Sequence, residues 1–252
     1  MTEETKAGEA CAGREEHADE LISPIVDLGS TVLRTARATI HCLTIVGQVE
    51  GHMLLPPNSK ATKYEHVLPL LARLEASEEI EGVLFLLNTM GGDVEAGLAI
   101  AELIAGMSKP TVSLVLGGGH SIGVPLAVAS KCTMIAASAS MTIHPVRMSG
   151  TMIAAPQTYH YFSRLQNRIV RFVIRHSHIT EERFLSLMMS AKDMAADVGS
   201  VIYGEEAVAC GLIDRIGSLS DALDCLQDQI ERNKRTKLPG GDAQADEPGR
   251  AT

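Results

Sequence analysis

The stretch Gly117-Gly118-Gly119-His120-Ser121-Ile122-Gly123 decides the fold. It follows an apolar, β-branched run, Thr111 to Leu116, and precedes the helix-compatible run Val124 to Ser130. A serine flanked by glycines between a strand and a helix is typical of a nucleophile elbow, in which a tight turn exposes the hydroxyl. Amides at the start of the following helix lack intrahelical acceptors and can hold an oxyanion. The pattern predicts Ser121 as a nucleophile; the alternative is a glycine-rich turn with an incidental serine.

Strands and helices alternate on both sides of this turn. The continuous apolar run at 82–87 is typical of a parallel strand that is buried on both faces. The run at 157–176 has one apolar stripe, with Tyr161, Leu165 and Phe172, which is too apolar to stand free in solvent, and we expect this stripe to pack against another surface. The pattern predicts an α/β fold with a largely parallel sheet. The expected strands are 39–46, 82–87, 111–116, 132–136 and 141–144, and the expected helices are 64–76, 93–107, 121–130, 157–176, 180–190, 205–210 and 219–233.

Composition and charge limit the classes of function. The 252 residues carry a net charge of −9 and no tryptophan, which disfavours a nucleic acid or an anionic membrane as partner. No apolar stretch approaches the ~18 residues of a spanning helix, and the N-terminal segment is acidic, unlike a signal peptide. We therefore expect a cytoplasmic protein without an integral membrane segment. The five cysteines include no C-x-x-C pair, which predicts reduced thiols, no metal site and no disulfide framework.

A serine nucleophile needs a base. His144 ends the expected strand at 141–144, and open α/β sheets bind ligands at such strand ends. His144 is therefore the predicted base. His120 adjoins Ser121, but a tight turn would point it away, toward the entrance of the site. Lys131, just past the elbow helix, leaves a serine–lysine pair as an alternative.

A second glycine-rich segment, Asn88-Thr89-Met90-Gly91-Gly92-Asp93, follows the strand at 82–87 and is expected to form a turn. The amide of Gly91 or Gly92 could supply one oxyanion donor and the amide of Ile122 the other. The alternative is a sharp turn that needs two glycines. The segment is not a dinucleotide fingerprint, because G-x-G-x-x-G is missing, and no P-loop occurs, so no cofactor is expected.

These motifs and one further segment occur in the order found in a known family. From about Ile40 to Leu223 the chain resembles the Clp-type serine peptidase family of the Clp/crotonase fold, and it is most similar to the TepA-like branch of translocation-enhancing proteins. The resemblance implies a ββα superhelix with parallel sheet layers and a projecting handle helix, whose apolar stripe would pack against the same helix of another subunit. It also implies a metal-free endopeptidase that acts on unfolded polypeptide inside a homo-oligomer of stacked rings. The matching segments are Asn88-Thr89-Met90-Gly91-Gly92 with Gly97, Gly119-His120-Ser121-Ile122-Gly123, Ile143-His144-Pro145, and Glu205-Glu206-Ala207-Val208 with Gly211-Leu212-Ile213-Asp214.

The resemblance assigns the catalytic serine and histidine to Ser121 and His144, and favours Gly92 as the glycine donor. The family's catalytic aspartate falls in a stretch that carries an insertion here, so Asp193 and Asp197 are both candidates. We favour Asp197, because it is an isolated charge among small and apolar residues. Asp214 lies in the family's structural Gly-Leu-Ile-Asp segment and is not expected to be catalytic.

The resemblance also divides the chain. We expect a disordered acidic segment at 1–28, a head domain at 29–147 and 177–233, a handle at 148–176 and a flexible tail at 234–252. The N-terminal region does not match the family's axial loops, so docking to an unfoldase is not implied. The usual Ser-Pro-Gly-Gly loop of the family reads Thr89-Met90-Gly91-Gly92 here and lacks its proline.

Three other functions compete with the peptidase. An α/β-hydrolase esterase needs a histidine after its aspartate, and no histidine follows His178 in the sequence. A crotonase-type acyl-CoA enzyme shares the fold but uses an acidic residue in place of a serine–histidine pair. A catalytically silent scaffold that assists protein export would keep the same motifs, and the sequence alone does not separate it from a peptidase.

Overall fold

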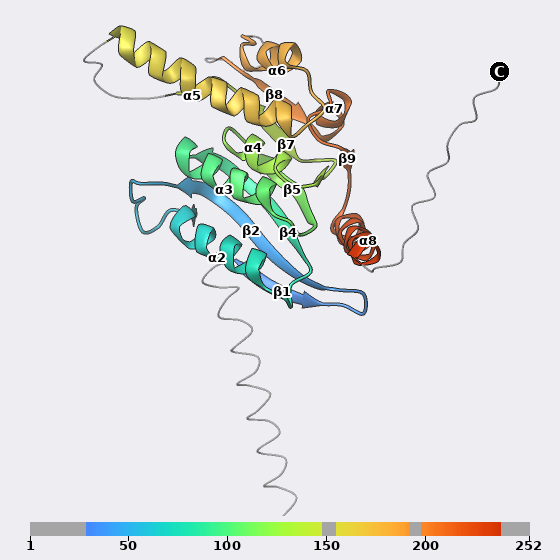
Figure 1. Ribbon diagram of the computed structural model, residues 1–252. Coiled ribbons are helices and arrows are strands. Elements are labelled where there is room, and N and C mark those ends of the chain that lie inside the picture. The colour runs from blue at the N-terminus through green and yellow to red at the C-terminus, as the bar shows by residue number, and fades with distance from the viewer. Residues whose placement is uncertain (1–28, 148–154, 192–197, 238–252) are drawn as a thin grey trace, which may run out of the picture.

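A largely parallel sheet forms the centre of the structure (Figure 1). The computed structural model describes residues 29–147, 155–191 and 198–237. The strands lie in the order β1-β2-β4-β5-β6-β9, with β3 beside β2 and with β7 pairing to both β5 and β8. β1–β2 and β7–β8 are antiparallel, and the other pairs are parallel, as the predicted α/β fold requires. The strands are β1 (Ser30–Arg34), β2 (Thr39–Glu50), β3 (Ala61–Lys63), β4 (Gly82–Gly92), β5 (Thr111–Gly119), β6 (Cys132–Ile135), β7 (Ser140–Ile143), β8 (Ser200–Tyr203) and β9 (Arg215–Ile216).

Helices cover both faces of this sheet, which explains the continuous apolar runs in its strands (Figure 1). On β4, Phe85 faces the core formed with α2, α3 and α4, while its neighbour Leu84 faces a second core that α8 closes. Alternate side chains of a strand point to opposite faces, so a strand between two cores is apolar at every position. The helices are α2 (Tyr64–Ala76), α3 (Val94–Gly106), α4 (Gly123–Val128), α5 (Ala155–Arg175), α6 (Glu181–Met188), α7 (Gly204–Ala209) and α8 (Leu219–Lys237).

Side-chain caps fix the ends of two helices near the predicted boundaries. The Asp93 carboxylate accepts a hydrogen bond from the Ala96 amide (2.8 Å), and so caps α3. The Thr180 hydroxyl accepts from the Arg183 amide (3.2 Å) at the start of α6. Such caps satisfy amides that the helix itself cannot. Because α3 starts from the end of β4, its cap also fixes where the glycine segment turns away from the sheet.

The predicted turn at 88–92 is wrong, because this segment continues β4. Val49 of β2 pairs with Gly92, and the ladder accommodates the segment by a register shift at Gly47 and Gln48. At this shift the Thr89 hydroxyl donates to the Gly47 carbonyl (2.6 Å) and accepts from the Gly91 amide (3.1 Å). A side chain thus replaces a missing ladder bond, which lets two glycines with positive φ remain in the sheet.

Helix α5 differs from the predicted assembly helix. Its N-terminal turns extend past the neighbouring helices (Figure 1), and Tyr159 and Tyr161 there are exposed. Leu165 and Phe172, by contrast, are buried within the subunit. Arg168 also forms a two-pronged ion pair with Glu95 of α3 (2.5 and 2.9 Å). The expectation that Leu165 and Phe172 pack against another subunit is therefore wrong.

The expected segments at 1–28 and 148–154, and most of the expected tail, lie outside the described residues. Helix α8 continues to Lys237, past the predicted end at 233, and Lys234 within it forms an ion pair with Glu81. Four strands, β1, β3, β8 and β9, were not predicted from the sequence. Three of these strands, β1, β3 and β9, lie at edges or in short pairings, where the periodic signal of a buried strand is weak.

Candidate active site

Ser121 occupies the strained turn that the sequence predicted. Its φ is +58°, and among the described residues it is the one non-glycine residue with positive φ. The Ser121 amide donates to the Thr142 carbonyl (2.9 Å), and the His120 amide donates to the Thr89 carbonyl (3.1 Å). The elbow is thus held by β7 on one side and by β4 on the other. Strain that surrounding bonds enforce in this way is a common feature of functional sites.

Glycine at position 91 allows the close approach of the elbow to β4. A Cβ atom on Gly91 would lie 2.6 Å from the Cβ and 3.2 Å from the Oγ of Ser121, and its φ of +96° disfavours any side chain. Gly92 lines the same pocket as Ser121. Gly91 therefore leaves space beside the serine, whereas a Cβ atom on Gly92 would collide with the Val49 backbone of β2, 2.2 Å from its carbonyl oxygen.

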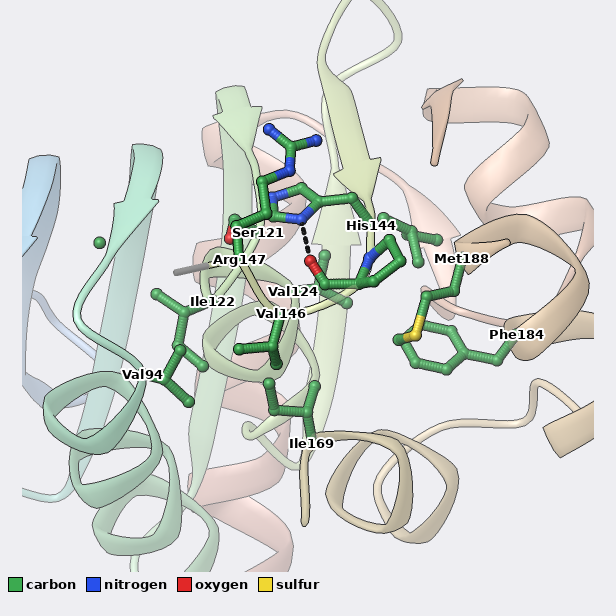
Figure 2. A pocket seen from close by; sticks show the side chains of 13 residues that line it. Val94, Ser121, Ile122, Val124, His144, Val146, Arg147, Ile169, Phe184 and Met188 are labelled. Atoms are coloured by element: carbon green, nitrogen blue, oxygen red, sulfur yellow. Dashed lines mark hydrogen bonds between the residues drawn. The ribbon is translucent and has the colours of Figure 1, made fainter. Parts of the chain in front are cut away.

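His144 lies directly after β7 and lines this pocket with Ser121 (Figure 2). Its Nδ1 atom is 2.6 Å from the Pro145 carbonyl oxygen, the contact drawn as a dashed line in Figure 2. Because a carbonyl oxygen can only accept, Nδ1 carries the proton and donates it. Nε2 of the neutral ring is then left with its lone pair, and in Figure 2 that nitrogen lies on the Ser121 side of the ring.

The pocket between these residues is small and mainly apolar. It has a volume of about 170 Å³. Arg147 lies at its edge next to the His144 ring (Figure 2). Its apolar wall combines residues from four helices and the segment after β7, namely Val94, Ile122, Val124, Val146, Ile169, Phe184 and Met188. This wall is not apparent from the sequence, because its members are scattered along the chain and each has the character of an ordinary core residue.

The neighbouring histidine and the lysine alternative lie elsewhere. His120 Nδ1 is 2.8 Å from the Thr142 hydroxyl, its side chain lines a different surface pocket with Asn88 and Met90, and burial lowers its pKa. His120 thus lies apart from the Ser121 pocket, as expected, but it does not line that pocket, so the expectation that it lines the entrance of the site is wrong. Lys131 donates through Nζ to the Ser108 carbonyl (2.8 Å) and does not line the Ser121 pocket, which removes the support for a serine–lysine pair.

The acidic candidates divide into two groups. Asp193 and Asp197 both lie outside the described residues. Asp214 accepts from the Thr133 amide (2.8 Å), while the Asp214 amide donates to the Thr133 hydroxyl (2.9 Å). This reciprocal pair connects Asp214 to β6, in accord with its expected structural role.

No cluster of histidine, cysteine, aspartate and glutamate side chains suited to a metal ion occurs among residues 29–147, 155–191 and 198–237. None of the helices in these ranges is both long and apolar enough to cross a membrane.

Residues 37–219 match the Clp protease family, and this match covers most of the chain. The chain therefore belongs to the Clp protease family. Its parallel-rich sheet with helices on both faces is consistent with that membership. The match favours the peptidase class over the acyl-CoA alternative.

Two relatives indicate the position of the chain within this class. The chain is 54% identical over 215 residues to the translocation-enhancing protein TepA of Halalkalibacterium halodurans, with 85% of this chain and 84% of that protein covered. It is 25% identical over 213 residues to the protein named "Putative protease MJ0651" of Methanocaldococcus jannaschii, with 71% of this chain and 65% of that protein covered. The first relative supports the TepA-like branch that the sequence motifs indicated.

Proposed function

We propose that this chain is a serine endopeptidase in which Ser121 attacks the peptide bond and His144 acts as the general base. The observation that carries the proposal is the left-handed Ser121, placed beside His144 in one pocket. Strain and exposure of this kind suit a nucleophile, which must reach a carbonyl carbon that packed core residues cannot approach.

The tautomer of His144 suits the first step. Since Nδ1–H is donated to the Pro145 carbonyl, Nε2 has the lone pair that can take the proton of the Ser121 hydroxyl. The same nitrogen would later return the proton to the leaving amine. A third residue that holds the ring in this orientation is the usual companion of such a pair.

We propose Asp197 as this acidic partner, with Asp193 as the alternative. A carboxylate would have to replace the Pro145 carbonyl as the acceptor of the hydrogen bond from Nδ1–H, or stabilise the imidazolium from nearby. A carboxylate stabilises the charged ring more than a neutral carbonyl does, because the attraction between opposite charges adds to the hydrogen bond. The acid would therefore matter most after the proton has moved to His144.

We propose two backbone amides as the donors that hold the oxyanion. The Ser121 and Gly123 amides donate to the Thr142 and His120 carbonyls, whereas within the described ranges the Ile122 amide has no acceptor. On β4, the Gly91 amide donates to Thr89 and the Asp93 amide to Val49, both on the β2 side. Since successive amides of an extended chain alternate in direction, we infer that the Gly92 amide faces the Ser121 side. Gly92 and Ile122 are therefore the proposed donor pair, and Gly91 provides clearance.

The apolar wall indicates what lies next to the scissile bond. A volume of about 170 Å³ suits one side chain of a substrate, and burying an apolar one against Phe184 and Met188 would be favourable. Unfolded polypeptide exposes such side chains. We propose unfolded chains as substrates on this ground, in a homo-oligomer that the resemblance to Clp peptidases suggests.

A fluorophosphonate probe tests the proposal, because it reacts only with activated serines. We expect the purified protein to gain one probe mass on the peptide that contains Ser121 and to cleave a denatured, dye-labelled polypeptide. Ser121→Ala should lose both, while Ser59→Ala, a change at an exposed loop serine, should keep both. Cleavage retained by the Ser121→Ala variant would reject the assignment.

A second function is favoured by a specific finding, the 54% identity to a protein named for enhancing translocation. In that case the fold would act as a scaffold in protein export, with the serine–histidine pair idle. A folded protein that neither reacts with the probe nor cleaves polypeptide would support this second function.

A further inference from the structure

Two cysteines outside the proposed active site lie in direct contact. Cys132 begins β6, and Cys225 lies on α8. Their Sγ atoms are 3.0 Å apart, although 93 residues separate them in the sequence. A disulfide bond has an S–S length of about 2.05 Å, so a shift of roughly 1 Å would join them. Both side chains are half-buried, and small reagents can therefore reach them.

The surroundings of the pair favour a reactive thiolate at Cys225. The Gln229 amide donates to Cys225 Sγ (3.4 Å), and Arg215 donates to Cys132 Sγ (3.7 Å). The thiol of Cys132, and then Gln229, Arg215 and Arg232, stabilise the Cys225 thiolate and lower its pKa to about 6, against the opposing effect of burial. The same contact raises the pKa of Cys132, so one sulfur is the nucleophile and the other the proton donor.

Two other cysteines of the described ranges lack this environment. Burial raises the pKa of Cys42 to about 11, and burial also raises the pKa of Cys210. The Cys210 thiol donates only to a backbone carbonyl, that of Ala207 (3.4 Å). Thiolates are the species that react with oxidants, so among the cysteines of the described ranges reactivity should be confined to the contacting pair.

We propose that Cys132 and Cys225 form a peroxide-driven disulfide that fastens α8 to β6. In the first step the Cys225 thiolate attacks one oxygen of hydrogen peroxide, the O–O bond breaks, and a sulfenic acid and hydroxide result. The Cys132 thiol, whose proton passes to this hydroxide, then attacks the Cys225 sulfur and displaces the second hydroxide, which is protonated to water. Each sulfur loses one electron, and one peroxide becomes two waters.

The bond would secure an element that noncovalent contacts now hold. Helix α8 closes the second core through Ala222, Leu226 and Ile230. Arg37 also binds α8 through Asp228 (2.6 Å) and Glu231 (2.8 Å), both solvent-accessible ion pairs. A cross-link over so long a loop restricts the unfolded chain strongly. Oxidation would therefore add a covalent bond to the noncovalent contacts that hold α8 on the sheet.

The test uses the full-length protein, reduced and then treated with a small excess of hydrogen peroxide. We expect the intact mass to fall by about 2 Da, with a tryptic cross-link between the Cys132 and Cys225 peptides. The melting temperature should rise by roughly 5–15 °C and fall back to its starting value when a dithiol reductant is added. Cys225→Ser should show neither change, and the matched control Cys210→Ser should show both.

Peptide mapping that finds any other cross-link, or none, would overturn the proposal. Should Cys225→Ser fail to fold, a measurement on the unchanged protein still decides. Alkylation of Cys225 by iodoacetamide should reach half its maximal rate near pH 6, the lowered pKa of this thiol. Half-maximal alkylation near the ordinary thiol value of about 8.5 would contradict the proposed thiolate.

Discussion

At the scale of single residues, Gly91 shows how little freedom the site allows. Gly91→Ala would place a methyl group 2.6 Å from the Ser121 Cβ, in a backbone conformation with φ of +96°. We expect the variant to lose at least about 100-fold in peptide cleavage and about 1–3 kcal/mol of unfolding free energy. Rates of peptide cleavage and urea denaturation curves measure the two effects.

The matched control is Gly106→Ala, at the end of α3. An added Cβ there meets no atom within 4 Å, so activity should be unchanged and stability equal or slightly higher. If Gly91→Ala behaved like this control, the elbow would not need a glycine beside it.

The two candidate aspartates are separated by parallel substitutions. Asp197→Asn keeps the size of the side chain but removes the charge that would stabilise the His144 imidazolium, so we expect a fall in kcat of about 10³–10⁴-fold. Asp193→Asn should change kcat by less than about 3-fold. Steady-state kinetics on a fluorogenic peptide give both values.

The reverse pattern would assign the acid to Asp193. Two mild effects would mean that the Pro145 carbonyl, 2.6 Å from Nδ1, is sufficient to orient the ring.

Only some residues of the candidate site were predictable from the sequence. Ser121 and His144 follow from short local patterns, because an elbow and a strand end are each defined by adjacent residues. The Thr89 bridge to Gly47 and Gly91 depends on a register shift between two strands, which no local pattern encodes. The Pro145 carbonyl is a backbone group, so side-chain reasoning does not find it.

At the scale of elements, β2 carries a buried histidine that makes stability depend on pH. His41 is almost fully buried, and its Nε2 has no hydrogen-bond partner among the residues that the structure describes. Burial, with a smaller effect of Arg73, lowers its pKa to about 4. The unfolded chain therefore binds more protons between pH 6.5 and 4. Stability is fully present above the ordinary histidine pKa of about 6.5 and falls as the pH drops.

We expect this histidine to contribute at most about 1.4 kcal/mol of lost unfolding free energy per pH unit over that range. His41→Leu should flatten the slope, whereas His66→Leu on exposed α2 surface should not. Denaturant unfolding at pH 7, 6, 5 and 4.5 measures the slopes, and equal slopes for the native chain and His41→Leu would contradict the assignment.

Most helices and strands next to the two hydrophobic cores were predictable, because burial there imposes a regular apolar pattern on the sequence. α2 has the predicted bounds, and β4 and β5 begin where the apolar runs begin. β8 was missed because it lies beside the insertion that displaced the family alignment. The prediction for the apolar stripe of α5 was also wrong. An amphipathic pattern indicates that one face of a helix is covered, but it does not indicate whether the same subunit or another one covers it.

At the scale of the whole molecule, the exposed N-terminal part of α5 is the candidate contact between subunits. Tyr159 and Tyr161 are 70% and 53% exposed there, on a helix that extends from the head. If subunits stack through this segment, Tyr159→Glu with Tyr161→Glu should lower the native mass of the particle while circular dichroism stays unchanged. Native mass spectrometry or light scattering gives the mass.

Phe172→Glu provides the contrasting change, because Phe172 is buried inside the subunit and its replacement should unfold the subunit itself. A native chain that already has the mass of one subunit would reject stacking altogether.

The second core also has a consequence for synthesis of the chain. The sheet face formed by Ile40, Leu84 and Leu114 is covered by α8, and α8 follows every strand in the sequence. During translation this apolar face stays bare until residues 219–237 have left the ribosome, however early the strands pair. A ribosome that stalls before that point would hold a nascent sheet with one apolar face exposed to solvent. Chaperones bind such forms, and they aggregate readily.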